Sequence, residues 1–353
     1  MNRDSLDPRL TAASIATNIL SGLCLMAEER GIACERWFAG LRLTRAQVDD
    51  ASVRVSYRQA SRVVQRALRD LPEPDIGLRL GRQQTTGNFG LLGLAMMTAR
   101  TFGDAVAIGL QYAPVSGSLM DLELDTSHPD ALCLVASPRS ADDTILPFLC
   151  EELFASTLML CRGLVGPSFR PLRLELAYPA PAYAHEYEAL FECEVRFGMP
   201  RNRELIDPGW MSRRLPAYNP VSAQQALALC RAQMPRGPAS GEIVAAVRQL
   251  LRSRLHEASG LGDIAAKLHL TPRTLRRQLV AAGSGFRAIH DEVRSERARE
   301  LLRDSELSIA QVGASVGFRD AREFRRAFKR WTGAAPSAMR APPRAGVTPA
   351  TGS

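Results

Sequence analysis

Ile309-Ala-Gln-Val-Gly-Ala-Ser-Val-Gly-Phe318 is one half of an internal repeat that decides the fold of the C-terminal part of the chain. The other half begins at Asp263-Ile-Ala-Ala-Lys-Leu268, and matching apolar residues lie 48 residues apart before a turn and 49 residues apart after it. They are Ile264, Ala265, Leu268, Leu270, Leu275 and Leu279 in the first copy, and Val312, Gly313, Val316, Phe318, Phe324 and Phe328 in the second. This spacing predicts two amphipathic helices in each copy, with the extra residue in the turn.

Capping residues divide each copy into a short helix, a tight turn and a second helix. In the first copy, Thr271-Pro272 supplies a hydroxyl N-cap and a proline at the first helical position, and Gly283 ends the helix. In the second copy, Gly317 ends the first helix, and Asp320 caps the next one with Glu323 three residues on, as in a capping box. These signals are typical of helix-turn-helix units, whose second helix projects steeply from the first.

Arginines cover one face of each second helix, opposite the apolar residues, and Val280 and Lys329 extend that face by a turn. The planar guanidinium can bond O6 and N7 of guanine or grip phosphate, and an α-helix fits the major groove of DNA. The residues predicted to contact bases are Arg273, Arg276, Arg277, Arg322, Arg325 and Arg326. Thr271, Asp320 and Lys329 are predicted to contact phosphate or to cap the helices.

A single amphipathic helix with charge on one face would not distinguish a DNA contact from an ordinary solvated surface. Two helices with arginines at equivalent positions favour DNA. Between the two copies, residues 286–302 predict one continuous helix of about 25 Å. Such a connector can hold the two second helices about 34 Å apart, one DNA turn, so that both enter successive major grooves. We therefore predict an all-α C-terminal domain with two helix-turn-helix units joined by a long helix.

The first 234 residues mix helical and strand periodicities. Helical spacing relates Ile15, Ile19, Leu23 and Met26, and Ser56 is placed to cap a further helix. Alternating or short β-prone runs predict strands over 120–125, 131–136, 172–176, 195–197 and 204–206, with helices over 142–164 and 181–191 between them. This order predicts an α+β domain with a largely antiparallel sheet.

The positive charge of the chain is concentrated towards its C-terminus. The 353 residues carry a net charge of +8. Residues 236–344 hold 21 Lys and Arg against 11 Asp and Glu, whereas the rest of the chain holds 24 against 26. A segment this basic attracts polyanions, either nucleic acid or an anionic membrane surface, and an ordinary solvated surface is the third interpretation.

Composition also indicates the domain boundaries. Residues 235–241 are rich in Pro and Gly and have no apolar periodicity, so we interpret them as a linker. We predict an effector-sensing or oligomerisation domain over 1–234, a DNA-binding domain over 242–341 and a disordered tail over 342–353. The N-terminus has no signal-peptide pattern and no apolar stretch approaches the roughly 20 residues that cross a bilayer. We therefore expect a cytoplasmic protein with no membrane partner.

The seven cysteines are odd in number, widely spaced and without a CxxC pair, which fits neither a disulfide framework nor a structural zinc site. We expect buried thiols, with redox sensing by Cys133, Cys150 or Cys161 as the alternative. No metal site, no cofactor and no catalytic residue is predicted.

The two repeat copies resemble the AraC/XylS family of bacterial transcription regulators. The similarity lies in residues 263–277, residues 309–318 and the segment from Asp320 to Arg340, and together these motifs cover about 100 residues. The resemblance implies base contacts from the first half of each second helix, which here holds the six arginines named above. Gly313 stands where the family usually has alanine, which should slightly weaken that helix.

Residues 10–233 resemble the N-terminal effector or oligomerisation domain of one branch of this family, often called arabinose-binding-like. The similarity is carried by Gly77-Leu-Arg-Leu-Gly81, by Gly87-Asn-Phe-Gly-Leu-Leu-Gly93 and by scattered residues of the following segment. These are Tyr178, Pro179, Tyr183, Tyr187, Phe191, Val195, Phe197, Gly198, Asn202 and Asp207. The name of the domain does not identify a ligand, so the effector stays unknown.

The sequence therefore predicts a sequence-specific transcription regulator of the AraC/XylS type, controlled by a small molecule bound to the N-terminal domain. Its predicted partners are double-stranded promoter DNA and an unidentified effector, with RNA polymerase and a second copy of the chain as further candidates. One alternative is an architectural DNA-binding protein without a sensor, which would show steep salt dependence and little sequence preference.

The other alternative is an enzyme fused to a DNA-binding module. The N-terminal half offers only His128 and His185, without metal-ligand spacing or a nucleophile motif, so no enzyme is predicted. The glycines of residues 87–93 could form a phosphate-binding loop, but no lysine is nearby. We therefore interpret them as turn and packing positions.

Two further groups of side chains have competing interpretations. His269 and His290 are interpreted as turn and helix-surface residues rather than phosphate contacts. Phe89 and Met96-Met97 are interpreted as core, with an apolar effector pocket as the alternative.

Overall fold

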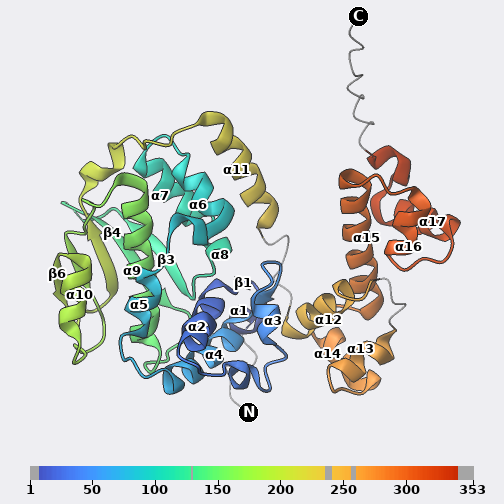
Figure 1. Cartoon of the computed structure of the whole chain (residues 1–353), viewed down its shortest axis with the longest axis horizontal. Helices are drawn as coiled ribbons and strands as arrows, with labels where there is room; N and C mark the ends of the chain where they lie inside the picture. The colour runs from blue at the N-terminus through green and yellow to red at the C-terminus, as the bar shows by residue number, and fades with distance from the viewer. Residues whose placement is uncertain (1–7, 129, 235–240, 256–259, 341–353) are drawn as a thin grey trace, which may run out of the picture. The chain divides into compact units, whose positions relative to one another are not determined.

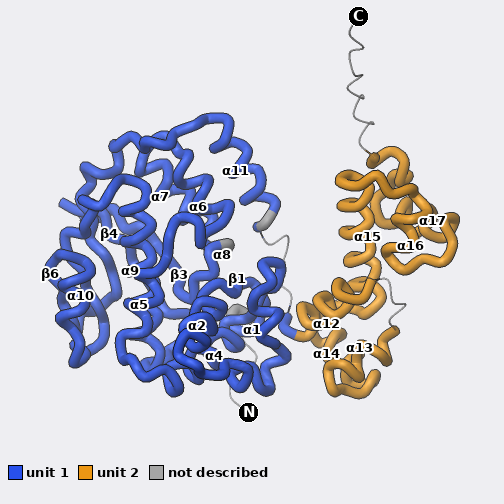
Figure 2. Tube along the Cα trace, viewed as in Figure 1, with its two compact units in different colours: residues 1–242 blue, residues 243–353 orange. Residues whose placement is uncertain are grey.

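The protein is divided into two compact units, residues 1–242 and 243–353 (Figure 2). The computed structural model describes residues 8–128, 130–234, 241–255 and 260–340. The predicted linker, apart from Gly241, and the predicted tail lie outside the described residues. None of the described helices is long and apolar enough to cross a membrane.

The first unit is built on a five-stranded mixed sheet with the order β3-β4-β7-β5-β6 (Figure 1). Its strands are β3 (Met120–Asp125), β4 (Leu132–Pro138), β5 (Arg173–Glu175), β6 (Glu194–Arg196) and β7 (Asn202–Ile206). Neighbouring strands are antiparallel except for β5 and β6, which run parallel. The predicted strands and the α+β class are confirmed.

Helices make up most of the rest of the first unit. They are α1 (Pro8–Thr11), α2 (Asn18–Glu29), α3 (Arg45–Val48), α4 (Tyr57–Asp70), α5 (Ile76–Arg82), α6 (Gly90–Met97), α7 (Phe102–Gln111), α8 (Ala113–Ser116), α9 (Leu146–Val165), α10 (Ala184–Phe191) and α11 (Pro220–Gln233), with short 3₁₀ turns η2 (Glu35–Phe38), η3 (Thr86–Phe89) and η4 (Pro208–Ser212). Ser56 caps α4 as predicted, because its hydroxyl accepts a hydrogen bond from the amide of Gln59 at 3.0 Å.

The prediction that Ile15 belongs to a helical stripe was wrong. Ile15 lies in β1 (Ile15–Ala16), which pairs with β2 (Arg54–Val55), and α2 begins only at Asn18. Pairing with Val55 buries the Ile15 side chain in the core. A contact across 40 residues of sequence overrode the local spacing.

Glycines allow the helices α5 and α9 to pack with their backbones close together. A Cβ on Gly77 would lie 2.8 Å from the carbonyl oxygen of Phe148, and one on Gly81 would lie 2.6 Å from the Cβ of Ala155. Since real Cβ atoms essentially never come that close to other atoms, both positions require glycine. Gly93 is likewise tight against the carbonyl of Thr86, so the glycines at 77–93 include several packing positions.

The second unit is all helical, as predicted. Its helices are α12 (Glu242–Arg252), α13 (Leu261–Lys267), α14 (Pro272–Ala281), α15 (Phe286–Asp304), α16 (Ile309–Ser315) and α17 (Ala321–Thr332), followed by the 3₁₀ turn η5 (Pro336–Met339). Figure 1 shows α15 as one unbroken helix between the two helix-turn-helix units, α13–α14 and α16–α17.

The helix α15 contributes to two separate apolar cores. Ile289 and Val293 are buried with Leu275 and Leu279 of the first helix-turn-helix unit. Ala298 and Leu302, later in the same helix, are buried with the second unit. Each helix-turn-helix unit is therefore anchored to the same connecting helix.

The two turns have the same backbone structure. His269 and Gly317, 48 residues apart, both have a left-handed φ, at +54° and +80°. In each turn the next residue donates its amide to the helix carbonyl five residues earlier, from Leu270 to Ala265 at 2.9 Å and from Phe318 to Gly313 at 2.9 Å. This is the Schellman motif, which ends a helix and redirects the chain. His269 is thus a turn residue, as interpreted from the sequence.

Candidate functional site

Each second helix, α14 and α17, buries its apolar face and exposes its arginines. Leu275, Leu279, Phe324 and Phe328 are at most 1% exposed and hold the helices on the body of the unit. The six arginines of the predicted base-contacting set are all exposed, as is Lys329. We call α14 and α17 the reading helices, and the six arginines of the predicted base-contacting set the reading arginines.

Unlike several other arginines of the same unit, the reading arginines have no partner among the described residues. Arg248 pairs with Glu292 at 2.6 Å, and Arg252 pairs with Glu296 at 2.7 Å. Across residues 241–255 and 260–340, no described side chain or carbonyl forms an ion pair or hydrogen bond with a reading arginine. Their donors face solvent, where a phosphate or a base edge can accept from them.

Thr271 and Asp320 act as helix caps. The Thr271 hydroxyl accepts from the amide of Thr274 at 3.1 Å, and an Asp320 carboxylate oxygen accepts from the amide of Arg322 at 2.9 Å. The expected capping box with Glu323 is not formed among the described hydrogen bonds. Asp320 bonds the amide two residues on rather than three, so the reciprocal geometry is not set up.

Two further residues belong to this surface or support it, Val280 as the sequence predicted and Arg294 as the sequence did not. Val280 lies 67% exposed on α14 beside the arginines, where an isopropyl group can contact the methyl group of thymine. Arg294 of α15 lies 4.9 Å from the ring centroid of Phe318 and donates to the carbonyl of Gly317 at 3.3 Å. It secures the second turn, and its contacts come from the fold rather than from any local sequence signal.

His290 packs into the structure instead of extending towards solvent. Its ring centroid lies 5.7 Å from that of Phe286, and the residue is half-buried. Burial, reinforced by nearby Arg294, lowers the pKa of His290 to about 4. The imidazole is therefore neutral near pH 7 and carries no charge for a phosphate.

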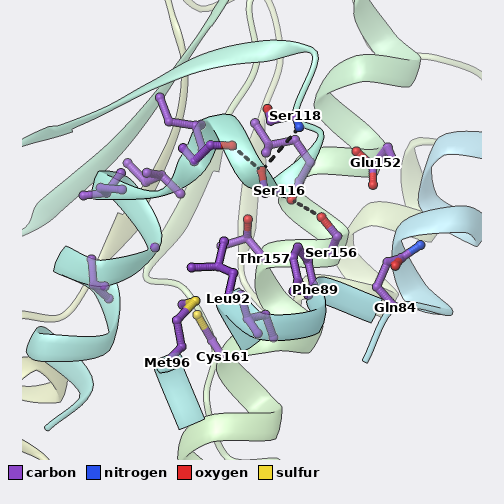
Figure 3. A pocket seen from close by; sticks show the side chains of 18 of the residues that line it. Gln84, Phe89, Leu92, Met96, Ser116, Ser118, Glu152, Ser156, Thr157 and Cys161 are labelled. Atoms are coloured by element: carbon purple, nitrogen blue, oxygen red, sulfur yellow. Dashed lines mark hydrogen bonds between the residues drawn. The ribbon is translucent and has the colours of Figure 1, made fainter. Parts of the chain in front are cut away.

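The first unit contains a cavity of about 110 Å³ between its helices and its sheet (Figure 3). The wall is mostly apolar and includes Phe89 and Met96, whereas Met97 packs against the core outside it. The structure therefore favours the pocket interpretation for Phe89 and Met96 and the core interpretation for Met97. A concave, mainly apolar space with few polar groups is typical of a small-molecule site.

Two buried carboxyl groups lie at or near this cavity. Glu152 of α9 lines it and is 7% exposed, and burial raises the pKa of Glu152 to about 7. Glu204 of β7 is fully buried, neither of its carboxylate oxygens has a hydrogen-bond partner among the described residues, and burial raises its pKa to about 8. Sequence reasoning missed both, because neither lies in a recognisable motif.

Comparison with known proteins shows which family this chain belongs to. Residues 31–215, more than half of the chain, match the model described as the arabinose-binding domain of AraC transcription regulators, and residues 264–342 match a helix-turn-helix domain. The chain belongs to the AraC family of transcription regulators. It is accordingly a DNA-binding transcription regulator, as the sequence predicted.

Relatives in this family match the chain over most of its length. It is 28% identical over 335 residues to the ornithine utilization regulator of Pseudomonas aeruginosa, covering 94% of this chain and 98% of that protein. It is 32% identical over 325 residues to an uncharacterized helix-turn-helix transcriptional regulator of Mycobacterium tuberculosis, covering 89% and 93%. The crystal structure of the transcriptional regulator CdpR from Pseudomonas aeruginosa is similar with a TM-score of 0.45 and 23% identity, covering 88% and 96%.

Proposed function

We propose that this AraC-family regulator reads promoter DNA with its six reading arginines, three in each of two successive major grooves. The observation that carries the proposal is that equivalent positions on two capped helices present exposed arginines that have no partner in the described part of the chain. The connecting helix α15 has 19 residues, which corresponds to about 28 Å at 1.5 Å per residue. That length suits two reading helices about one DNA turn apart.

The proposal assigns DNA recognition to residues 242–341 and control by a small molecule to residues 1–234. The cavity beside Phe89 and Met96 supports the second assignment, because it offers an apolar space with a few polar groups. A second copy of the chain and RNA polymerase are the further partners of a regulator of this kind. Since one chain carries two reading helices, DNA recognition does not itself require a dimer.

Selection of random duplexes by the full-length protein tests the proposed sequence-specific DNA binding. We expect a preferred site with two half-elements about one helical turn apart, bound at least ~10³-fold more tightly than a scrambled duplex. Affinity for both duplexes is then compared at two salt concentrations. Equal and salt-sensitive binding to both would contradict the proposal and support an architectural DNA-binding protein.

A fragment of residues 242–341 tests whether DNA recognition belongs to this segment alone. It should bind the selected site with the same sequence preference as the full chain. If the fragment binds all sequences equally while the full chain does not, recognition depends on the first unit and the assignment is wrong.

A further inference from the structure

Among the described residues that line the cavity of the first unit, one side chain carries a carboxyl group and none is basic. That residue is Glu152, and the other polar lining groups are amides and hydroxyls such as Gln84, Ser116, Ser156 and Thr157. Figure 3 shows Glu152 and Gln84 on the same side of the cavity, with Ser156 one turn further along α9. Charge in this cavity is therefore set by one carboxyl group.

The Glu152 carboxylate lies without a partner in the described part of the first unit. Across residues 8–128 and 130–234, no described group donates a hydrogen bond to it or forms an ion pair with it. The adjacent Glu151, on the same helix, instead accepts hydrogen bonds from the hydroxyls of Tyr183 and Tyr187. A buried carboxylate without donors costs several kcal/mol unless a partner is supplied. Glu151 therefore has a structural role, whereas Glu152 does not have the contacts for one.

The nearby hydroxyl groups do not meet this need. Ser156 donates to the carbonyl of Leu153 at 2.9 Å, and Ser116 donates to the carbonyl of Ala113 at 2.8 Å. With these donors used by the backbone, the Glu152 carboxylate and the side-chain oxygen of Asn18 are left as acceptors without a donor among the described residues, and of the two only Glu152 can carry a charge. An entering molecule would find an apolar surface with one anionic anchor.

We propose that the cavity binds a small molecule with one protonated amine, which pairs with Glu152, and an apolar body that packs beside Phe89 and Met96. This inference rests on the proposed control by a small molecule and names the chemical class of that molecule. A cavity of about 150 Å³ holds a benzene molecule, so the 110 Å³ found here suits an apolar group no larger than one aromatic ring. The ammonium group supplies the missing donors, and exclusion of water strengthens the pairing.

Three probes of similar size and different charge test the inference on the full-length chain. They are benzylamine, benzyl alcohol and benzoate, with binding followed by calorimetry and by the shift in thermal unfolding. We expect benzylamine to bind most tightly and benzoate to be excluded. Glu152→Gln should weaken benzylamine binding about 10- to 100-fold, the range of a charge-assisted hydrogen bond, and leave benzyl alcohol binding unchanged.

Two further variants show whether the effect is specific to the charge of Glu152 and to the cavity. Glu188→Gln removes one negative charge from an exposed position of α10 and should leave benzylamine binding unchanged. Met96→Trp should weaken both benzylamine and benzyl alcohol, because it fills the apolar part of the cavity. If Glu152→Gln does not fold, Glu152→Met provides the same test.

Benzylamine binding no tighter than benzyl alcohol binding, or equal benzylamine binding by wild type and Glu152→Gln, overturns the inference. So does a lack of binding by benzylamine. None of these outcomes affects the regulator function, which is measured separately as the DNA sequence preference of the same preparation. Binding of benzyl alcohol alone would retain a small-molecule site and exclude the cationic class.

Discussion

At the scale of single residues, Arg326 and Arg330 lie four positions apart on α17 but have different surroundings. Arg330 pairs with Asp291 at 3.3 Å, whereas Arg326 has no partner among the described residues. Both are exposed, so their removal changes the net charge equally and little packing is lost. They form a matched pair for separating base contacts from general electrostatic attraction.

Arg326→Ala should weaken binding to the preferred duplex by about 1–3 kcal/mol and relax preference at one base pair. Arg330→Ala, the control, should cost at most the ~1 kcal/mol of an exposed ion pair and leave sequence preference intact. Titrations with duplexes substituted at single positions check both. Equal weakening by Arg326→Ala on every duplex would assign it to phosphate instead.

The backbone of His269 makes a prediction about stability. A left-handed φ of +54° is costly for a residue with a Cβ, and the side chain is exposed, so little packing is lost on its removal. His269→Gly should stabilise the second unit by about 1 kcal/mol. Gly317→Ala should do the opposite, because its Cβ would lie 2.6 Å from the carbonyl oxygen of Leu255. Denaturant unfolding without DNA measures both, and a loss of stability in His269→Gly would contradict the argument.

The buried carboxyl of Glu204 makes stability dependent on pH. Its pKa is raised from 4.5 to about 8, so the unfolded chain loses this proton first as the pH rises. Below pH 4.5 the group is protonated in both states and has no effect; between pH 4.5 and 8 it increasingly destabilises the fold, and above pH 8 the penalty is constant. Glu204→Gln should therefore raise the unfolding midpoint most at pH 8 and least at pH 5. A difference in unfolding midpoint between Glu204→Gln and wild type that does not change with pH would refute this. The exposed Glu188→Gln serves as the control.

At the scale of elements, the packing of α5 on α9 leaves no room for a side chain at the contact between the two helix backbones. Gly81→Ala would place a methyl group 2.6 Å from the Cβ of Ala155 and 2.7 Å from the carbonyl of Glu152, so we expect a loss of about 1–3 kcal/mol. Gly109→Ala in α7 is the control, because its new Cβ would meet only the end of the flexible Met96 side chain. Thermal unfolding of both variants checks this. Equal effects would show that the backbone contact is not the cause.

Elements with a strong local pattern could be predicted from the sequence. The strand β3 has its predicted bounds, and α9 starts four residues later than predicted. Periodicity identifies such elements because each buries one face. The ribbon of β1 and β2 could not be predicted, because two-residue strands show no period and depend on a distant partner.

At the scale of the whole molecule, the two candidate sites differ in how far sequence could locate them. The reading arginines lie within two short repeats, so a helical period is enough to place them on one face. The cavity is lined by segments that range from Asn18 to Ile206, and only the tertiary fold brings them together. Glu152 looks like any helical glutamate until its burial and lack of partners are known.

The helix α15 also determines where the second unit can tolerate an inserted residue. Because α15 is anchored in both cores, inserting one residue between Val293 and Ala298 would rotate one reading helix by about 100° relative to the other. One of the two would then face away from the groove that it is proposed to enter. An extra residue in a turn, such as Arg319, has no such effect, because it leaves the helical phase between the two cores unchanged.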